Sequence, residues 1–141
     1  MKNKSELVIN KYGSKKWYLN GKYHREDGPA VEHISGYKAW YLNGKLHRIN
    51  GPAIEWSNGN KEWYLNGKLH RIDDPAVEYV DGWKAWYLNG KKHRIDGPAI
   101  EFGKDYKKWY LNDIEVKKEN VIDFNPEITE REYIKFILEL N

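Results

Sequence analysis

The stretch Trp40-Tyr-Leu-Asn-Gly-Lys-Leu-His-Arg-Ile-Asn-Gly-Pro-Ala-Ile-Glu-Trp56 decides the fold of this chain. Its opening block, Trp-Tyr-Leu-Asn, returns every 23 residues without insertion and begins at Trp17, Trp40, Trp63, Trp86 and Trp109. Self-similarity at a fixed step of this size is the signature of a repeat architecture. The sequence therefore predicts an array over roughly residues 5–115: a half unit, four full units and a closing Trp-Tyr-Leu-Asn.

Other positions of the unit keep the same step. They are His-Arg at 24–25, 47–48, 70–71 and 93–94, Pro-Ala at 29–30, 52–53, 75–76 and 98–99, Glu32, Glu55, Glu78 and Glu101, and Lys15, Lys38, Lys61, Lys84 and Lys107. One set of contacts is therefore expected to recur in every unit.

Each unit reads as two strands joined by turns. Residues 37–42 are rich in β-formers and alternate, which places Trp40 and Leu42 on one face and Tyr41 on the other. Residues 52–56 form the second strand, with Ile54 on the face of Trp40 and the Ala and Glu positions on the face of Tyr41. Whether residues 45–48 prolong the first hairpin or form a third strand stays open.

Two glycine positions are predicted to differ in their demands. Asn43-Gly44 and its equivalents favour a type I′ turn, in which both central residues have positive φ. The residue before Pro is pushed to extended backbone, and Asp74 replaces glycine there in one unit. We therefore expect that the Asn-Gly turn accepts only residues that adopt positive φ, whereas the position before Pro accepts residues other than glycine.

The last residues change character. Asn125 and Pro126 suit the start of a helix, and Tyr133, Phe136, Ile137 and Leu140 fall on one helical face. We expect residues 1–120 to form the repeat array and residues 121–141 a helix that caps it; a helix that binds a partner is the alternative. Residues 121–141 hold five acids and two bases, a net charge of −3, so the +3 of the whole chain leaves +6 on residues 1–120.

The pattern Tyr-Leu-Asn-Gly-Lys-x-His, with a short strand after it and a step of 23, resembles a MORN repeat. The His-Arg-x-Asp-Gly-Pro-Ala segment is closer to bacterial and viral MORN variants, including antitoxin-like chains, than to the usual pattern. The resemblance implies a mainly β fold, an elongated antiparallel sheet of stacked β-hairpins, used as a protein-interaction surface and not for a reaction.

The composition excludes several classes of protein and of binding site. The 141 residues include no Cys, which removes disulfides and thiolate metal sites, while 7 Trp and 11 Tyr argue against disorder. No run approaches the 18 or so apolar residues of a membrane span, and the start lacks the apolar region of a signal peptide. A cytoplasmic protein is expected, in the host cytoplasm if it is encoded by a phage.

The repeated polar residues do not suggest a catalytic or metal site. Equivalent residues of neighbouring units would lie about 9–10 Å apart, twice the strand spacing, which is too far for two His ligands of one zinc ion. We expect no enzyme activity and no cofactor. The His-Arg pairs either hold the irregular segments between strands or contact a ligand.

The sequence thus predicts a scaffold that binds, and by its antitoxin-like resemblance inhibits, a partner protein; the alternative is a nucleic-acid-binding module, because the array is basic and rich in aromatic residues. Tyrosine suits protein interfaces, although these side chains could instead stack along the array. A homodimer through a sheet edge or the C-terminal helix is a further expectation. The candidate partner-binding residues are Tyr41, Tyr64, Tyr87, Arg48, Arg71, Arg94, His47 and His70.

Overall fold

The computed structural model describes residues 4–120 and 134–135. Residues 4–120 consist of short antiparallel strands, their turns and one 3-10 helix at Lys118–Asn120, so the expectation of a mainly β fold is confirmed. The capping helix expected over residues 121–141 lies outside the described residues. The chain divides into two compact units, Met1–His70 and Arg71–Asn141, which are described separately.

The first unit contains an antiparallel sheet in the order β1-β2-β4-β5-β8-β9, with β3 paired to β2 and with the hairpins β6-β7 and β10-β11 beside it. The bounds are β1 Glu6–Ile9, β2 Lys15–Leu19, β3 Lys22–Tyr23, β4 Val31–Glu32, β5 Lys38–Ala39, β6 Tyr41–Leu42, β7 Lys45–Leu46, β8 Ile54–Glu55, β9 Lys61–Glu62, β10 Tyr64–Leu65 and β11 Lys68–Leu69.

The second unit repeats this plan in the order β12-β13-β16-β17-β18, with the hairpin β14-β15. The bounds are β12 Val77–Glu78, β13 Trp83–Ala85, β14 Tyr87–Leu88, β15 Lys91–Lys92, β16 Ile100–Phe102, β17 Tyr106–Leu111 and β18 Ile114–Val116.

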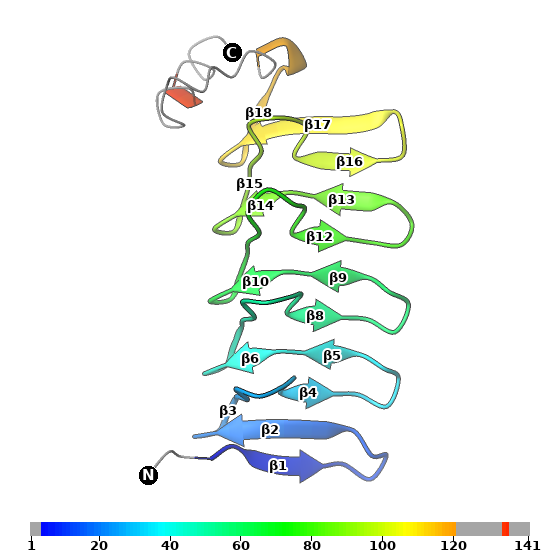
Figure 1. The fold of residues 1–141 in the computed structure, drawn as a ribbon, viewed down its shortest axis with the longest axis vertical. Helices are drawn as coiled ribbons and strands as arrows, with labels where there is room; N and C mark the ends of the chain where they lie inside the picture. Colours follow the sequence, from blue (N-terminus) through cyan, green and yellow to red (C-terminus); the bar gives the residue numbers. More distant parts are fainter. Residues whose placement is uncertain (1–3, 121–133, 136–141) are drawn as a thin grey trace. The chain divides into compact units, whose positions relative to one another are not determined.

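The Trp strand of each repeat is interrupted at its Trp. β5 ends at Ala39 and β6 begins at Tyr41, so the two follow one another along one row (Figure 1). The Trp40 N–H donates to the Ala53 carbonyl at 2.8 Å, while the Trp40 carbonyl accepts from His47 N–H at 3.0 Å. One backbone residue thus joins two pairings, and residues 45–46 form a strand of their own, which answers the question that the sequence left open.

The Asn-Gly turns have the predicted conformation. Asn43 has φ 51° and Gly44 φ 79°, and the two residues connect Leu42 with Lys45, its cross-strand partner. Positive φ at both central residues of a two-residue loop is the type I′ geometry, so this prediction is confirmed. The Gly44 N–H donates to the carbonyl of Tyr23 at 2.8 Å, which ties each turn to the hairpin of the preceding repeat.

The faces of the sheet differ from those expected. Ala39 lies opposite Ile54, and because cross-strand partners share a face, Ile54 lies with Ala39 and not with Trp40. Trp40 instead lies with Glu55, on the other face. The error came from the register, since alternation along one strand does not fix how the next strand is aligned with it.

The repeated alanines are buried. Ala30, Ala39 and Ala53 are each 0% exposed, and their equivalents in the second unit, Ala76, Ala85 and Ala99, are buried too. The sequence placed the Ala positions on the face of Tyr41, and Ala39 lies on that face, where it is covered by its neighbours. A small side chain is needed there because larger residues of the neighbouring strands pack over it.

One face of the main sheet carries an alternating ladder of charges. In the first unit the register places Lys15, Glu32, Lys38, Glu55 and Lys61 side by side, and in the second it does the same for Glu78, Lys84, Glu101 and Lys107. Opposite charges directly across a strand pair are favourable, by about 0.2–1 kcal/mol each. The register thus places each Glu beside a Lys, whereas the ion pair of each Glu is formed with an Arg, as in Arg48 with Glu55 at 2.8 Å.

The turn conformation makes a testable prediction. Gly67 has φ 80°, a region that a β-branched residue avoids, so Gly67→Val should lower the melting temperature by several degrees, about 1–3 kcal/mol of strain. Asp74→Gly, which installs the glycine of the other repeats, is the matched change and should have a small effect. Similar melting temperatures for the two variants, followed by circular dichroism, contradict the assignment.

Candidate functional site

The His-Arg pairs at 24–25, 47–48 and 93–94 each place their arginine over the Trp of the same repeat. The guanidinium carbon of Arg48 lies 3.8 Å from the centroid of the Trp40 ring. Arg48 Nη1 also donates to Glu55 Oε1 at 2.8 Å and to the Pro52 carbonyl at 3.0 Å. We call this set, Arg48 with Trp40, Pro52 and Glu55, the arginine clamp.

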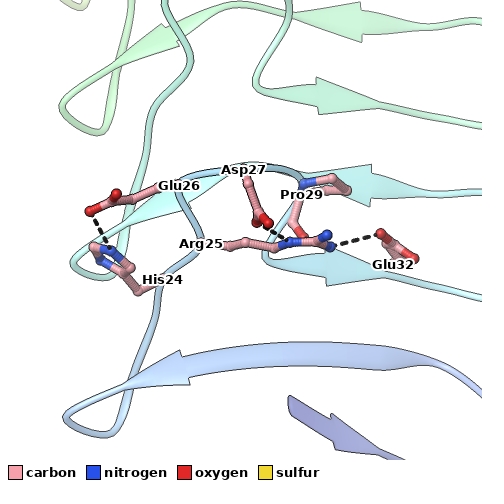
Figure 2. Close-up of polar contacts among 6 residues, drawn as sticks. All are labelled: His24, Arg25, Glu26, Asp27, Pro29 and Glu32. Carbon is pink, nitrogen blue, oxygen red and sulfur yellow. Dashed lines mark hydrogen bonds and ion pairs between the residues drawn. The ribbon is translucent and has the colours of Figure 1, made fainter. Parts of the chain in front are cut away.

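The clamp recurs along the chain. Arg25 and Arg94 lie 3.9 and 4.0 Å from the centroids of Trp17 and Trp86. Their Nη1 atoms lie 3.0 and 3.4 Å from Glu32 and Glu101, and Arg71 Nη1 lies 2.6 Å from Glu78. Figure 2 shows Arg25 of the first copy with Asp27, Pro29 and Glu32, without Trp17. Arg25 Nε donates to Asp27 Oδ1 at 2.8 Å. The predicted site residues Arg48, Arg71 and Arg94 are thus all held by contacts inside the sheet.

The clamp explains the glycine before each proline. A Cβ atom on Gly28 or Gly97 would lie 2.8 Å from the guanidinium carbon of Arg25 or Arg94, too close for a side chain. Neither of these two glycines has positive φ, as expected, whereas Gly51, the third glycine before a proline, has φ 156°. Asp74 is tolerated because Asp73 takes φ 66° and the Asp74 carboxylate pairs with Arg71 Nη2 at 3.0 Å. The position before proline therefore accepts a residue other than glycine only when the backbone beside it changes in this way.

The repeated histidines hold the Asn-Gly turns. Nδ1 of His47 accepts the backbone N–H of Asn66 at 3.1 Å, and the same contact joins His24 to Asn43 and His93 to Asn112. These three histidines therefore hold the turn of the following repeat. His70, the other predicted histidine, donates its backbone N–H to the Trp63 carbonyl at 3.0 Å.

The predicted tyrosines lie on the other face of the sheet. Tyr41 stacks on Tyr23 with ring centroids 5.2 Å apart, and Tyr23 stacks on Tyr18 at 4.9 Å. Tyr37 meets Trp56 edge to face at 5.9 Å, and the Tyr64 hydroxyl donates to Glu62 at 2.8 Å. We call this surface of the first unit, formed by Tyr18, Tyr23, Tyr37, Tyr41, Trp56 and Tyr64, the tyrosine face.

The tyrosine face is only partly covered. Its six rings are all half-buried, and Tyr87 of the second unit has the same intermediate exposure. Burial, and then the neighbouring Tyr23, raises the pKa of Tyr41, because both disfavour a charged phenolate. Tyr41 therefore stays a neutral hydrogen-bonding group under physiological conditions. The predicted tyrosines and the predicted arginines face opposite sides and do not form one site.

Two cavities lie beside the clamps, and sequence reasoning missed them. One, of about 600 Å³, is lined by Trp17, Leu19 and the 24–27 loop, with Lys4 and Ser5. The other, of about 360 Å³, lies in the second unit between the loops at 71–73 and 93–96, over Trp86 and Leu88. The available signal was the apolar residue after His-Arg, since Ile49 and Ile72 are 79% and 69% exposed.

The described residues, 4–120 and 134–135, contain no cluster of three or more His, Cys, Asp or Glu side chains that could hold a metal ion. None of the helices in this part of the chain has the length and apolar character needed to cross a membrane.

Comparison with known proteins returned no match to a family model, a curated protein or a solved structure.

The histidine contact is testable through stability. His47→Ala leaves the Asn66 amide without its acceptor, and we expect a loss of about 1–2 kcal/mol in the free energy of unfolding, measured with urea. His33→Ala is the control, since His33 is exposed and bonds only within its own loop, to Ser35 at 2.8 Å. Equal losses for the two variants would show that the turn does not depend on His47.

Proposed function

We propose that this chain is a non-enzymatic scaffold that binds a partner protein through its tyrosine face. The observation that carries the proposal is a row of adjacent aromatic rings, tilted by 31° and 43° against one another, that keeps part of its surface exposed. Tyrosine is enriched at protein interfaces because its ring contributes area at a low entropy cost and its hydroxyl bonds to the partner.

The use of the polar residues supports a scaffold in preference to an enzyme. In each repeat the arginine is held by a Glu side chain and a Pro carbonyl, and three of the histidines bond the next turn. Groups that are committed to structural contacts in several equivalent copies are poor candidates for a single asymmetric reaction centre.

The finer parts of the proposal rest on the resemblance to MORN repeats of the bacterial and viral, antitoxin-like kind. They are inhibition of the partner, a location in the cytoplasm, stacked hairpins as the extended form of the array, and a C-terminal helix that caps it. His47, His70 and the clamp arginines Arg48, Arg71 and Arg94 stay predicted contact residues, on the side away from the tyrosines.

A specific observation favours nucleic acid as the second candidate. Lys22, Lys45 and Lys68 of the first unit are exposed, each follows an Asn-Gly turn, and none forms an ion pair with another described residue. The register pairs Lys45 with Leu42, so these cations lie on the face away from Tyr41, where they would contact the phosphates of a nucleic acid. If this candidate is correct, affinity for an oligonucleotide should fall steeply between low and physiological salt, because counterions are released on binding.

The protein-binding proposal is tested by photo-crosslinking in a lysate of the natural host. Benzoylphenylalanine at position 64, on the tyrosine face, should capture one defined protein. The same probe at position 61, which is exposed on the charge-ladder face, is the matched control. With the captured partner purified, Tyr64→Ala should weaken binding at least fivefold, about 1 kcal/mol, whereas Tyr64→Phe should retain most of the affinity.

Two outcomes would overturn this proposal. One is equal capture at positions 61 and 64, which would mean that the tyrosine face is not the contact surface. The other is an unchanged affinity of Tyr64→Ala for the purified partner, provided that the variant unfolds at the urea concentration of the parent protein.

A further inference from the structure

The cavity of the second unit is a built feature of the fold with no role in the contacts described so far. Its floor is the strand segment from Trp86 to Leu88, and its walls are two successive His-Arg-x-Asp loops that contribute Ile72 and Ile95. At about 360 Å³ it lies near the lower end of the range for ligand pockets, which suits one large side chain and its neighbours.

The rim of this cavity is apolar where most of the chain is polar. Ile72 is 69% exposed in a protein with a mean hydropathy of −0.93, and Ile95 repeats its position 23 residues later. An isolated exposed isoleucine needs no explanation, but Ile72 and the half-buried Ile95 line one cavity together with Trp86 and Leu88, which makes the site apolar. The floor and rim therefore favour an apolar occupant.

The charged side chains at the cavity indicate which charge the occupant should carry. The charged side chains that line it are two bases, Arg71 and Arg94, and two acids, Asp73 and Asp96. Both arginines are already paired, Arg94 with Asp96 at 2.8 Å and Arg71 with Glu78 at 2.6 Å. Asp73 is exposed and forms no ion pair with any described residue, so its carboxylate is available at the rim.

We propose that this cavity receives an aliphatic side chain from a partner polypeptide, next to a Lys or Arg of that partner which pairs with Asp73. The occupant is a basic, apolar peptide segment. The carboxylate of Asp73 favours a cationic neighbour at the rim and disfavours a phosphate or an acidic side chain there. The site lies on the Trp86 face, away from Tyr87, so the inference stands independently of the tyrosine face.

The test uses the full chain and an acetylated, amidated peptide of alternating Lys and Leu as the probe. Nuclear magnetic resonance follows the isoleucine methyl groups and the Trp indole N–H groups during titration. We expect saturable shifts at Ile72, Ile95 and Trp86. Ile72→Ser and Asp73→Asn should each weaken binding at least fivefold; asparagine also tolerates the positive φ at position 73.

Val80→Ser is the matched control, because Val80 is 67% exposed in the same unit but belongs to another loop and does not line the cavity. Equal affinity for an alternating Lys–Ser or Glu–Leu peptide overturns the inference, as does the absence of saturable shifts at these residues up to millimolar peptide. Matching shifts with oligothymidylate, or on simple concentration of the protein, would identify a nucleic acid or a second copy as the occupant and also overturn it.

Discussion

The contact of an arginine guanidinium with the indole ring of its own repeat, held from the side by a glutamate, is the interaction on which each repeat depends. It joins three segments that are short and otherwise weakly connected: the Trp strand, the loop after the Asn-Gly hairpin and the Pro-Ala strand. Strands of two residues have few ladder hydrogen bonds, so side chains must hold them in register. The clamp does so, and it requires a glycine or a rearranged backbone beside the arginine.

The two faces of the sheet make different contacts, and the clamp lies on one of them. On the clamp face, charges pair with each other in a ladder, and the Trp rings lie under guanidinium groups. On the opposite face the alanines and the tyrosines pack, and the tyrosine rings keep part of their surface exposed. The arginines and glutamates of the clamps are thereby occupied internally. The surfaces proposed for a partner protein are the tyrosine face and the cavity over Trp86 and Leu88.

The local features could be predicted from the sequence because they depend on nearest neighbours. Asn43 and Gly44 specify their turn because both residues readily adopt positive φ. The step of 23 residues indicates a repeated structural unit. The faces could not be predicted in this way, because they depend on the alignment of Ala39 with Ile54, a contact between strands that alternation leaves open. The roles of Arg48 and His47 were missed for the same reason: their partners Glu55 and Asn66 lie 7 and 19 residues away and meet them only after the strands pair.

The clamp as the organising contact is tested most directly by a double-mutant cycle between Arg48 and Glu55. Arg48→Met keeps most of the stem over Trp40, Glu55→Gln keeps the shape, and the free energy of unfolding of both single variants and the double variant is measured with urea. The account predicts a coupling energy of about 1–3 kcal/mol, and near zero for the control cycle of Arg48 with Glu62, which lies on the other face. Losses that add to within about 0.3 kcal/mol for Arg48 and Glu55 would contradict it.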